Sequence, residues 1–212
     1  MTHPVDELDR QSFAGALERV LGESLDLRVT AALHQHYLEL LRWAPKVDLV
    51  GPAVFDELFE RHYGESLAGR PLLPESGTLV DLGSGAGFPG FVLAAARPDL
   101  EVYLVEPRVR RAAFLAAAVR RAGLACHCLD AKVDPSLSLE LPARIDVVTV
   151  RALRLPAKVW AALAARLAPG GRVLVWAGPT SDRLPPPWFA GRRIALPRGH
   201  REIVEYRLSE KR

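Results

Sequence analysis

The chain has 212 residues, of which 49% are hydrophobic and 25% are charged, and its formal net charge is +3 at pH 7. These values are ordinary for a soluble globular protein. No apolar run approaches the ~20 residues that cross a bilayer, and the acidic start has no apolar core segment, which argues against a membrane protein and a secretory signal. The small positive charge permits a nucleic-acid partner without requiring one.

The first third of the sequence has apolar residues at helical spacing. This pattern predicts helices over 5–22, 27–43 and 53–68. A turn-rich segment with Gly69, Pro71, Pro74 and Gly77 follows them. We therefore predict an N-terminal helical appendage over 1–74 and a second domain over 75–212.

Strand-like and helix-like segments alternate in the second part of the chain. The predicted strands are 78–82, 101–105, 126–129, 145–150 and 172–176, and the predicted helices are 88–96, 108–122 and 154–168. Such alternation is typical of a parallel sheet with right-handed crossovers. Two further strand-like runs, 192–196 and 202–208, predict an antiparallel hairpin at the sheet edge.

A glycine-rich segment joins the first of these strands to the helix that follows. Its residues Gly85 to Gly90 satisfy G-x-G-x-x-G, the pattern of a dinucleotide site, where a helix start binds a pyrophosphate. Asp81 argues against that ligand, because a carboxylate two residues before the first glycine, Gly83, would oppose a dianion. S-adenosylmethionine has no phosphate, and Asp81 can accept a hydrogen bond from its ammonium group, directly or through water. The sequence favours S-adenosylmethionine over a dinucleotide and over a plain tight turn.

Glu106 ends the second predicted strand, 25 residues after Asp81. Its carboxylate can accept charge-assisted hydrogen bonds from two ribose hydroxyls, or it can simply cap the next helix. The backbone of Gly83, Gly85 and Gly87 permits close approach of the methionine and ribose portions. Together these features predict a class I S-adenosylmethionine-dependent methyltransferase: an α/β, Rossmann-like, mostly parallel sheet with a C-terminal antiparallel hairpin, preceded by the helical appendage.

Cys126 and Cys128 flank His127 in a predicted strand, where they are poorly placed for a disulfide. Reduced thiols indicate a cytoplasmic protein. Because no second cluster of ligands completes four-coordination, we predict no metal site.

The glycine loop together with Arg97-Pro98-Asp99 resembles the glucose-inhibited division protein B family, the guanine-N7 methyltransferases of 16S ribosomal RNA (small-subunit methyltransferase G). The resemblance covers roughly residues 30–208. It implies S-adenosylmethionine as cofactor and 16S ribosomal RNA or the small ribosomal subunit as partner. We predict a monomer. Carried over by position, the family's cofactor contacts are Gly83, Phe88, Val133, Asp134 and Arg151.

The position of these residues agrees with that role. Val133 and Asp134 follow the third strand, where a backbone amide can meet the adenine edge, although an ordinary polar loop is the alternative. Arg151 ends the fourth strand, at the edge of the sheet where ligands bind. It is a candidate for positioning the reactants, with a structural ion pair to Asp81 or Glu106 as the alternative. His62 is predicted to be a packing histidine, with a contact to RNA or cofactor as the alternative.

An RNA substrate also needs phosphate contacts. Arginines at strand ends and in loops near the expected cofactor side are candidates, with a solvated basic face as the alternative. They are Arg108, Arg110, Arg111, Arg154, Arg198 and Arg201.

Four positions depart from the family's usual residues. Asp48 and Val50 replace the asparagine and threonine of Asn-Leu-Thr, Glu65 replaces an aspartate, and Ala177 replaces a lysine. The asparagine and lysine are expected on the side that faces RNA. Two alternatives therefore stay open: a methyltransferase for another RNA or a small molecule, and a non-catalytic RNA- or ribosome-binding module that retains the cofactor.

Guanine N7 carries a free lone pair, so its methylation needs positioning and electrostatics but no prior deprotonation. The sequence has no convincing general-base or nucleophile constellation, which fits this chemistry. No catalytic residue is assigned.

Overall fold

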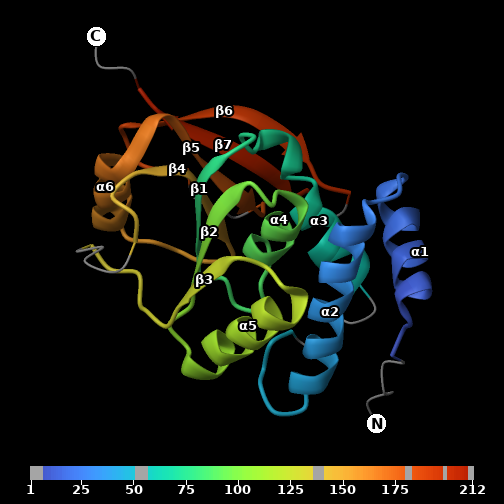
Figure 1. Cartoon of the computed structure of the whole chain (residues 1–212). Coiled ribbons are helices and arrows are strands. Elements are labelled where there is room, and N and C mark those ends of the chain that lie inside the picture. The colour runs from blue at the N-terminus through green and yellow to red at the C-terminus, as the bar shows by residue number, and fades with distance from the viewer. Residues whose placement is uncertain (1–6, 51–56, 136–140, 180–182, 198–199, 210–212) are drawn as a thin grey trace.

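The computed structural model describes residues 7–50, 57–135, 141–179, 183–197 and 200–209. Its centre is one seven-stranded sheet in the order β3-β2-β1-β4-β5-β7-β6 (Figure 1). Strands β1 to β5 pair in parallel, and β7 pairs antiparallel with β5 and β6. The predicted edge hairpin is thus confirmed. The strands are β1 Gly77–Leu82, β2 Leu100–Val105, β3 Cys126–Leu129, β4 Ile145–Arg151, β5 Leu167–Ala177, β6 Trp188–Ala195 and β7 Glu202–Leu208.

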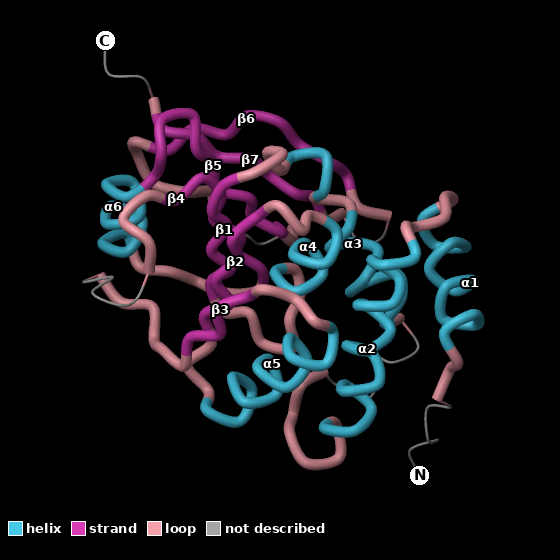
Figure 2. The backbone as a smooth tube through the Cα atoms, viewed as in Figure 1, coloured by secondary structure: helices cyan, strands magenta, loops and turns pink. Residues whose placement is uncertain are grey.

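Helices cover the sheet and extend to one side of it (Figure 2). The α-helices are α1 Arg10–Leu21, α2 Leu27–Trp43, α3 Glu65–Leu67, α4 Gly90–Ala96, α5 Val109–Ala122 and α6 Ala157–Arg166, with a π-helix η2 at Leu58–Gly64 and a 3-10 turn η3 at Arg70–Leu72. No helix in the described ranges is long and apolar enough to span a membrane.

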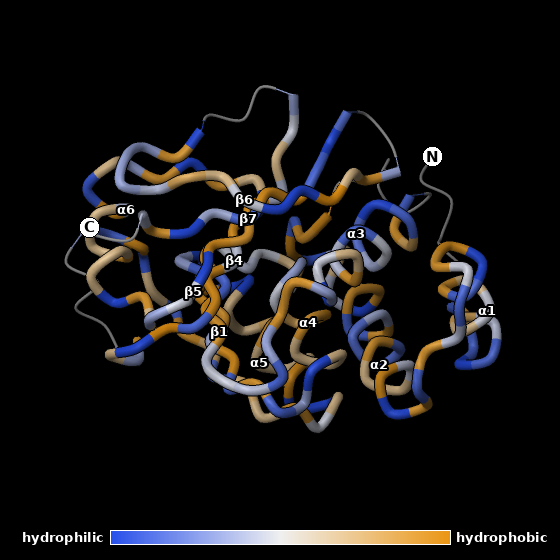
Figure 3. Tube along the Cα trace, turned by 90° about the horizontal axis from the view of Figure 1, so that it is seen from above, coloured by the Kyte–Doolittle hydropathy of each residue, from blue (hydrophilic) through white to orange (hydrophobic). Residues whose placement is uncertain are grey.

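The two faces of the sheet have separate apolar cores. Neighbouring strand residues point to opposite faces, so Leu79 joins the core beneath α4 and α5, whereas Val80 joins the core beneath α6. Seen from above, apolar residues gather along β1, β4 and β5 (Figure 3). A sheet buried on both faces is typical of parallel α/β proteins, which confirms the predicted fold class.

The N-terminal helices begin at aspartate caps. Asp9 Oδ1 accepts from the Ser12 N–H at 2.7 Å, and Asp26 Oδ1 accepts from the Arg28 N–H at 2.7 Å. Helix α2 then packs against α4 and α5, and its buried residues belong to the same core as theirs. The division at residue 75 stays a prediction, and the two predicted parts share one apolar core.

Some predicted boundaries differ from the structure. The predicted helix 53–68 lies partly outside the described residues, and its described part is η2 followed by α3. Helix α6 begins at Ala157 because Pro156, in extended conformation, precedes it, and β6 begins at Trp188, four residues before the predicted strand.

Candidate active site

The glycine loop follows β1 directly and turns into α4. Three of its glycines, Gly83, Gly85 and Gly87, have positive φ. A Cβ built at Gly85 would lie 3.8 Å from Arg111 Nη1 and from the Gly83 carbonyl oxygen, at ordinary van der Waals distance. A residue with a side chain would be strained at these three positions, and glycine leaves no Cβ between the backbone of the loop and a ligand.

Asp81 lies beneath this loop, at the end of β1, with 1% of its surface exposed. Its Oδ2 accepts from the Gly90 N–H at 3.2 Å, and its Oδ1 accepts from the Thr149 hydroxyl at 2.6 Å. Burial raises the pKa of this carboxyl to about 6, although its hydrogen bonds to Thr149 and Gly90 oppose the rise. Asp81 thus ties the start of α4 to β1 and β4. Its contact with a cofactor ammonium stays a prediction.

Glu106 follows β2 and meets the other end of the loop. Its Oε2 accepts from the Gly85 N–H at 2.9 Å, and its Oε1 accepts from the Arg108 N–H at 3.0 Å. The carboxylate therefore fixes the glycine loop against the start of α5, and it lies at the strand end where ribose recognition was predicted. The alternative role, a cap on the next helix, accounts for the hydrogen bond from the Arg108 N–H but not for that from the Gly85 N–H.

A histidine that the sequence did not single out holds the loop from the opposite side. His36 of α2 is fully buried, with Nε2 2.8 Å from the Ala86 carbonyl and Nδ1 2.8 Å from the Tyr63 hydroxyl. Because a carbonyl only accepts, Nε2 carries the proton and the Tyr63 hydroxyl donates to Nδ1. Burial lowers the pKa of His36 to about 4, which keeps this tautomer neutral. No local pattern marks a contact across 50 residues.

Arg151, at the end of β4, forms an ion pair with Glu65, not with Asp81 or Glu106 as the structural alternative supposed. Its Nη2 lies 3.0 Å from Glu65 Oε2 and also donates to the Arg61 carbonyl at 2.6 Å. Arg201 binds the same carboxylate with both terminal nitrogens: its Nη2 lies 2.5 Å from Glu65 Oε1, and its Nη1 donates to Glu65 Oε2 at 3.2 Å. The Trp176 indole N–H donates to the Glu65 carbonyl at 2.8 Å.

This Glu65 cluster is mostly buried. The Glu65 side chain is 2% exposed, and those of Arg151 and Arg201 are 13% and 19% exposed. Burial lowers the pKa of Arg151 to about 10 and raises that of Glu65, while their mutual attraction opposes both shifts. Arg151 Nη1 is buried and has no hydrogen-bond partner in the described residues. A buried polar atom without a partner requires an explanation, and at a strand end a ligand group or an ordered water can supply the partner.

A large hollow opens beside Arg151, at the carboxyl ends of β4 and β5. Its volume is about 690 Å³. Cationic and aromatic side chains share its lining, and Ala177 stands on its wall. The cationic and aromatic members are Arg61, Arg151, Arg154, Arg183, Arg201, Trp160 and Trp176.

His62 connects this hollow to the glycine loop, which goes beyond the predicted packing role. Its ring lies 4.7 Å from that of Phe88, between centroids, and it lines the hollow. Burial is the largest cause that lowers the pKa of His62, repulsion from Arg151 is the next, and the pKa falls to about 3. The buried Nδ1 has no partner among the described residues.

This burial predicts a pH dependence of stability. The pKa of folded His62 lies below its unfolded value, so protons favour the unfolded chain, and stability is lost as pH falls below about 6.5. The loss approaches about 1.4 kcal/mol per pH unit while the folded ring stays neutral. His36, whose pKa is also lowered, acts in the same direction as His62, whereas Asp81 and Glu65, whose pKa values are raised, act in the opposite direction and reduce the net slope.

His62→Gln isolates the contribution of His62, because both carboxyls and His36 are retained. We expect the slope of unfolding free energy against pH, from urea titrations between pH 4.5 and 6, to fall by about 1.4 kcal/mol per unit in this variant. Parallel slopes for the two proteins would contradict the burial of a neutral His62.

The other predicted residues separate into groups. Val133 follows β3 and packs against the core beneath α6, and Asp134 is half-buried beside it. Arg154 and Arg201 line the large hollow, whereas Arg108, Arg110 and Arg111 line a second hollow at the start of α5. Arg198 lies outside the described residues. Two of the positions that depart from the family's usual residues also differ in their surroundings. Asp48 pairs with Arg111 at 3.3 Å, whereas Glu65 is buried.

Residues 30–183 match the family model described as GidB, rRNA small subunit methyltransferase G. The chain belongs to this family. A Ribosomal RNA small subunit methyltransferase G from Desulfotalea psychrophila is 40% identical over 56% of the chain, which spans 57% of that relative. The one from Xanthomonas euvesicatoria is 38% identical over 84% of the chain and 85% of the relative. The mitomycin 7-O-methyltransferase MmcR shares the fold, with a TM-score of 0.58 and 17% identity over 95% of this chain and 74% of that one.

Proposed function

We propose that this family member transfers a methyl group from S-adenosylmethionine to N7 of a guanine in 16S ribosomal RNA. The observation that carries the proposal is the placement of an acid-bordered glycine loop beside a basic, aromatic hollow at one edge of the sheet. Family membership supplies the substrate class. The Xanthomonas relative supports this over most of its length, whereas the Desulfotalea match spans little more than half of that protein.

The residues at the loop fit this cofactor. Two carboxylates, Asp81 and Glu106, border the loop, and such charge opposes a pyrophosphate but suits an ammonium group and ribose hydroxyls. Gly83, Gly85, Gly87 and Phe88 would line the approach, Val133 and Asp134 the adenine side, and Arg151 Nη1 would donate to an acceptor. When bound, the cofactor supplies an electrophilic methyl group on a sulfonium.

The hollow fits a nucleotide that needs no deprotonation. Glu65, its only carboxylate among the described lining residues, is held by two arginines and cannot act as a free base. Trp160 and Trp176 line the hollow and can contact a base, and the exposed Arg154 and Arg183 of the same lining can neutralise phosphates. In-line positioning and electrostatics are then sufficient for attack by the N7 lone pair.

The decisive experiment follows radiolabel from the cofactor into RNA of a strain that lacks this enzyme. We expect label in 16S ribosomal RNA, recovered as 7-methylguanosine after nuclease digestion and mass spectrometry. Label confined to a small-molecule extract would favour a different methyl acceptor. Salt-dependent RNA binding without label in free RNA, subunits or assembly intermediates would favour a non-catalytic RNA-binding module.

Removal of the loop acids tests the cofactor site. Asp81→Ala and Glu106→Ala should each weaken cofactor binding by about 1–3 kcal/mol, since each removes a charged hydrogen-bond acceptor at the loop. Isothermal calorimetry measures the change, with Glu101→Ala, at an exposed position of β2, as the control that should bind like the wild type. Unchanged affinity in both loop variants would refute the assignment of this pocket.

A further inference from the structure

A basic surface lies outside the hollow, along the groove between α2 and α5. Six exposed cations form this basic strip: Arg42, Lys46, Arg108, Arg110, Arg120 and Arg121. They border two hollows of about 310 and 320 Å³ that share Lys46. Arg110 Nη1 lies 3.5 Å from the Lys46 carbonyl, which joins the two hollows into one surface.

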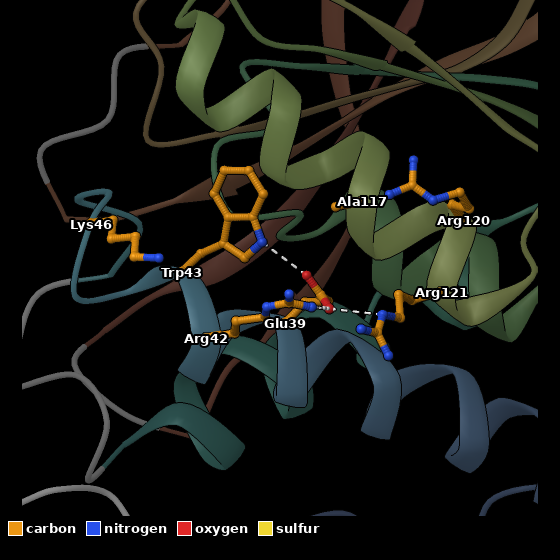
Figure 4. Close-up of a pocket in the computed structure, with 7 residues that line it drawn as sticks. All are labelled: Glu39, Arg42, Trp43, Lys46, Ala117, Arg120 and Arg121. Carbon is orange, nitrogen blue, oxygen red and sulfur yellow. Dashed lines mark hydrogen bonds and ion pairs between the residues drawn. The ribbon is translucent and has the colours of Figure 1, made fainter.

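The negative charge near the strip does not neutralise it. Glu39 is 5% exposed and pairs with Arg121 at 3.1 Å and Arg42 at 3.6 Å, so one buried carboxylate holds two arginines (Figure 4). The exposed Asp48 pairs with Arg111 instead. Among the described residues, Lys46 and Arg120 form no ion pair. The six cations of the strip and these two carboxylates together carry a larger positive formal charge than the whole chain, whose formal charge is +3.

The strip also has a fixed aromatic side chain. Trp43 lines the groove between Lys46 and Arg121, and its indole N–H donates to Glu39 Oε2 at 2.8 Å (Figure 4). The same carboxylate therefore orients an aromatic ring and two guanidinium groups. Cations interleaved with an aromatic ring suit a phosphate backbone with unpaired bases more than they suit an acidic protein surface.

One end of the strip reaches the proposed cofactor site. Arg108 precedes α5, and its backbone N–H binds Glu106, whereas Arg120 and Arg121 lie in the last turn of α5. A 14-residue helix is about 20 Å long. No residue of the strip lines the methyl-transfer hollow, so an RNA that lies along the strip would leave that hollow free.

We infer that the basic strip is a second RNA-contact surface, which binds phosphates of the substrate RNA outside the nucleotide that enters the hollow. This inference rests on the proposed function and assigns the affinity for RNA to α2 and α5. Arg151 and Arg201, which are bound to Glu65, contribute to the hollow instead. The strip carries no base-specific contact, so its effect is uniform across RNA sequences.

The test compares two charge-reversed proteins. Lys46→Glu with Arg120→Glu alters the strip without breaking an ion pair to a described residue, and Arg28→Glu with Arg144→Glu makes the same charge change at exposed positions elsewhere. Binding of a 16S ribosomal RNA transcript is measured at several salt concentrations, with cofactor affinity from calorimetry as the check on folding. We expect the strip variant to lose at least about tenfold in RNA affinity at 0.1 M salt and about two in the slope of log K against log salt. The control should retain both.

Each alternative result overturns the inference in a distinct way. Equal RNA affinity and slope in the two variants would remove the strip from RNA binding. Normal binding to the transcript, with weakened binding to the assembled subunit only, would assign the strip to a ribosomal protein. Absence of methyl transfer by the wild type would sink the proposed function by itself, whatever the strip variants show.

Discussion

Replacement of Glu65 by glutamine is expected to destabilise the fold by about 3 kcal/mol and to abolish methyl transfer. Glutamine leaves the guanidinium groups of Arg151 and Arg201 mostly buried without a counter-charge, and breaking a buried pair from one side costs about 3–5 kcal/mol. Some exposure of both arginines puts the expected value at the lower end. Urea unfolding at pH 7 measures the loss.

The matched control is Glu57→Gln. It makes the same chemical change in an ion pair with Arg61, whose nitrogen lies 2.6 Å from the Glu57 carboxylate, but these side chains are 32% and 41% exposed. Exposed pairs contribute about 1 kcal/mol or less, so this variant should be nearly as stable as the wild type. If the two variants unfold at the same urea concentration, Glu65 is not the buried centre of the cluster.

A second readout separates positioning from stability. In addition to its effect on stability, Glu65→Gln should weaken cofactor binding, because Arg151 then loses the carboxylate that orients it at the end of β4. Glu65→Asp keeps the charge at a position where the family usually has aspartate, and it should recover most of the cofactor affinity. Recovery of stability without recovery of cofactor affinity would confine Glu65 to a structural role.

The parallel sheet was predictable because its signals are local. Apolar runs that end at the acids Asp81 and Glu106 define β1 and β2 to within one residue of their observed bounds. The prediction was poorer for β5, which begins at Leu167, inside the predicted helix 154–168. The glycine loop is recognisable from its own glycines, and the turn of the final hairpin is indicated by Pro197 and the polar residues after it. Pattern and composition contain this information without reference to distant segments.

The contacts that shape the site were not predictable in this way. Glu65 meets Arg151 and Arg201 across 86 and 136 residues, and a lone glutamate in a short helix carries no sign of such partners. From the sequence it was only a departure from the family pattern. His36 likewise has no motif, since its partner is a backbone carbonyl, a group that every residue possesses. Both residues lie in the part predicted to be an appendage, yet both support the candidate site.

Gly90→Ala should cause the other large loss, about 2–3 kcal/mol of stability together with at least tenfold weaker cofactor binding. A Cβ at this position would lie 2.5 Å from both Cβ and Oδ2 of Asp81, inside van der Waals contact. Neither side can move freely, because Asp81 is held by Thr149 and by the Gly90 N–H itself. Relief of the clash must therefore displace the start of α4, and with it the glycine loop.

Gly15→Ala provides the contrast that decides between crowding and a general effect of the substitution. Gly15 lies inside α1, and a Cβ there would meet nothing within 4 Å, so alanine should stabilise the helix by about 0.5–1 kcal/mol. Opposite signs for the two variants in thermal unfolding, with cofactor affinity changed only at Gly90, are the expected result. If Gly90→Ala binds the cofactor as the wild type does, the bond from Asp81 to the loop does not set the geometry of the site, and Asp81 acts through direct contact with the ligand instead.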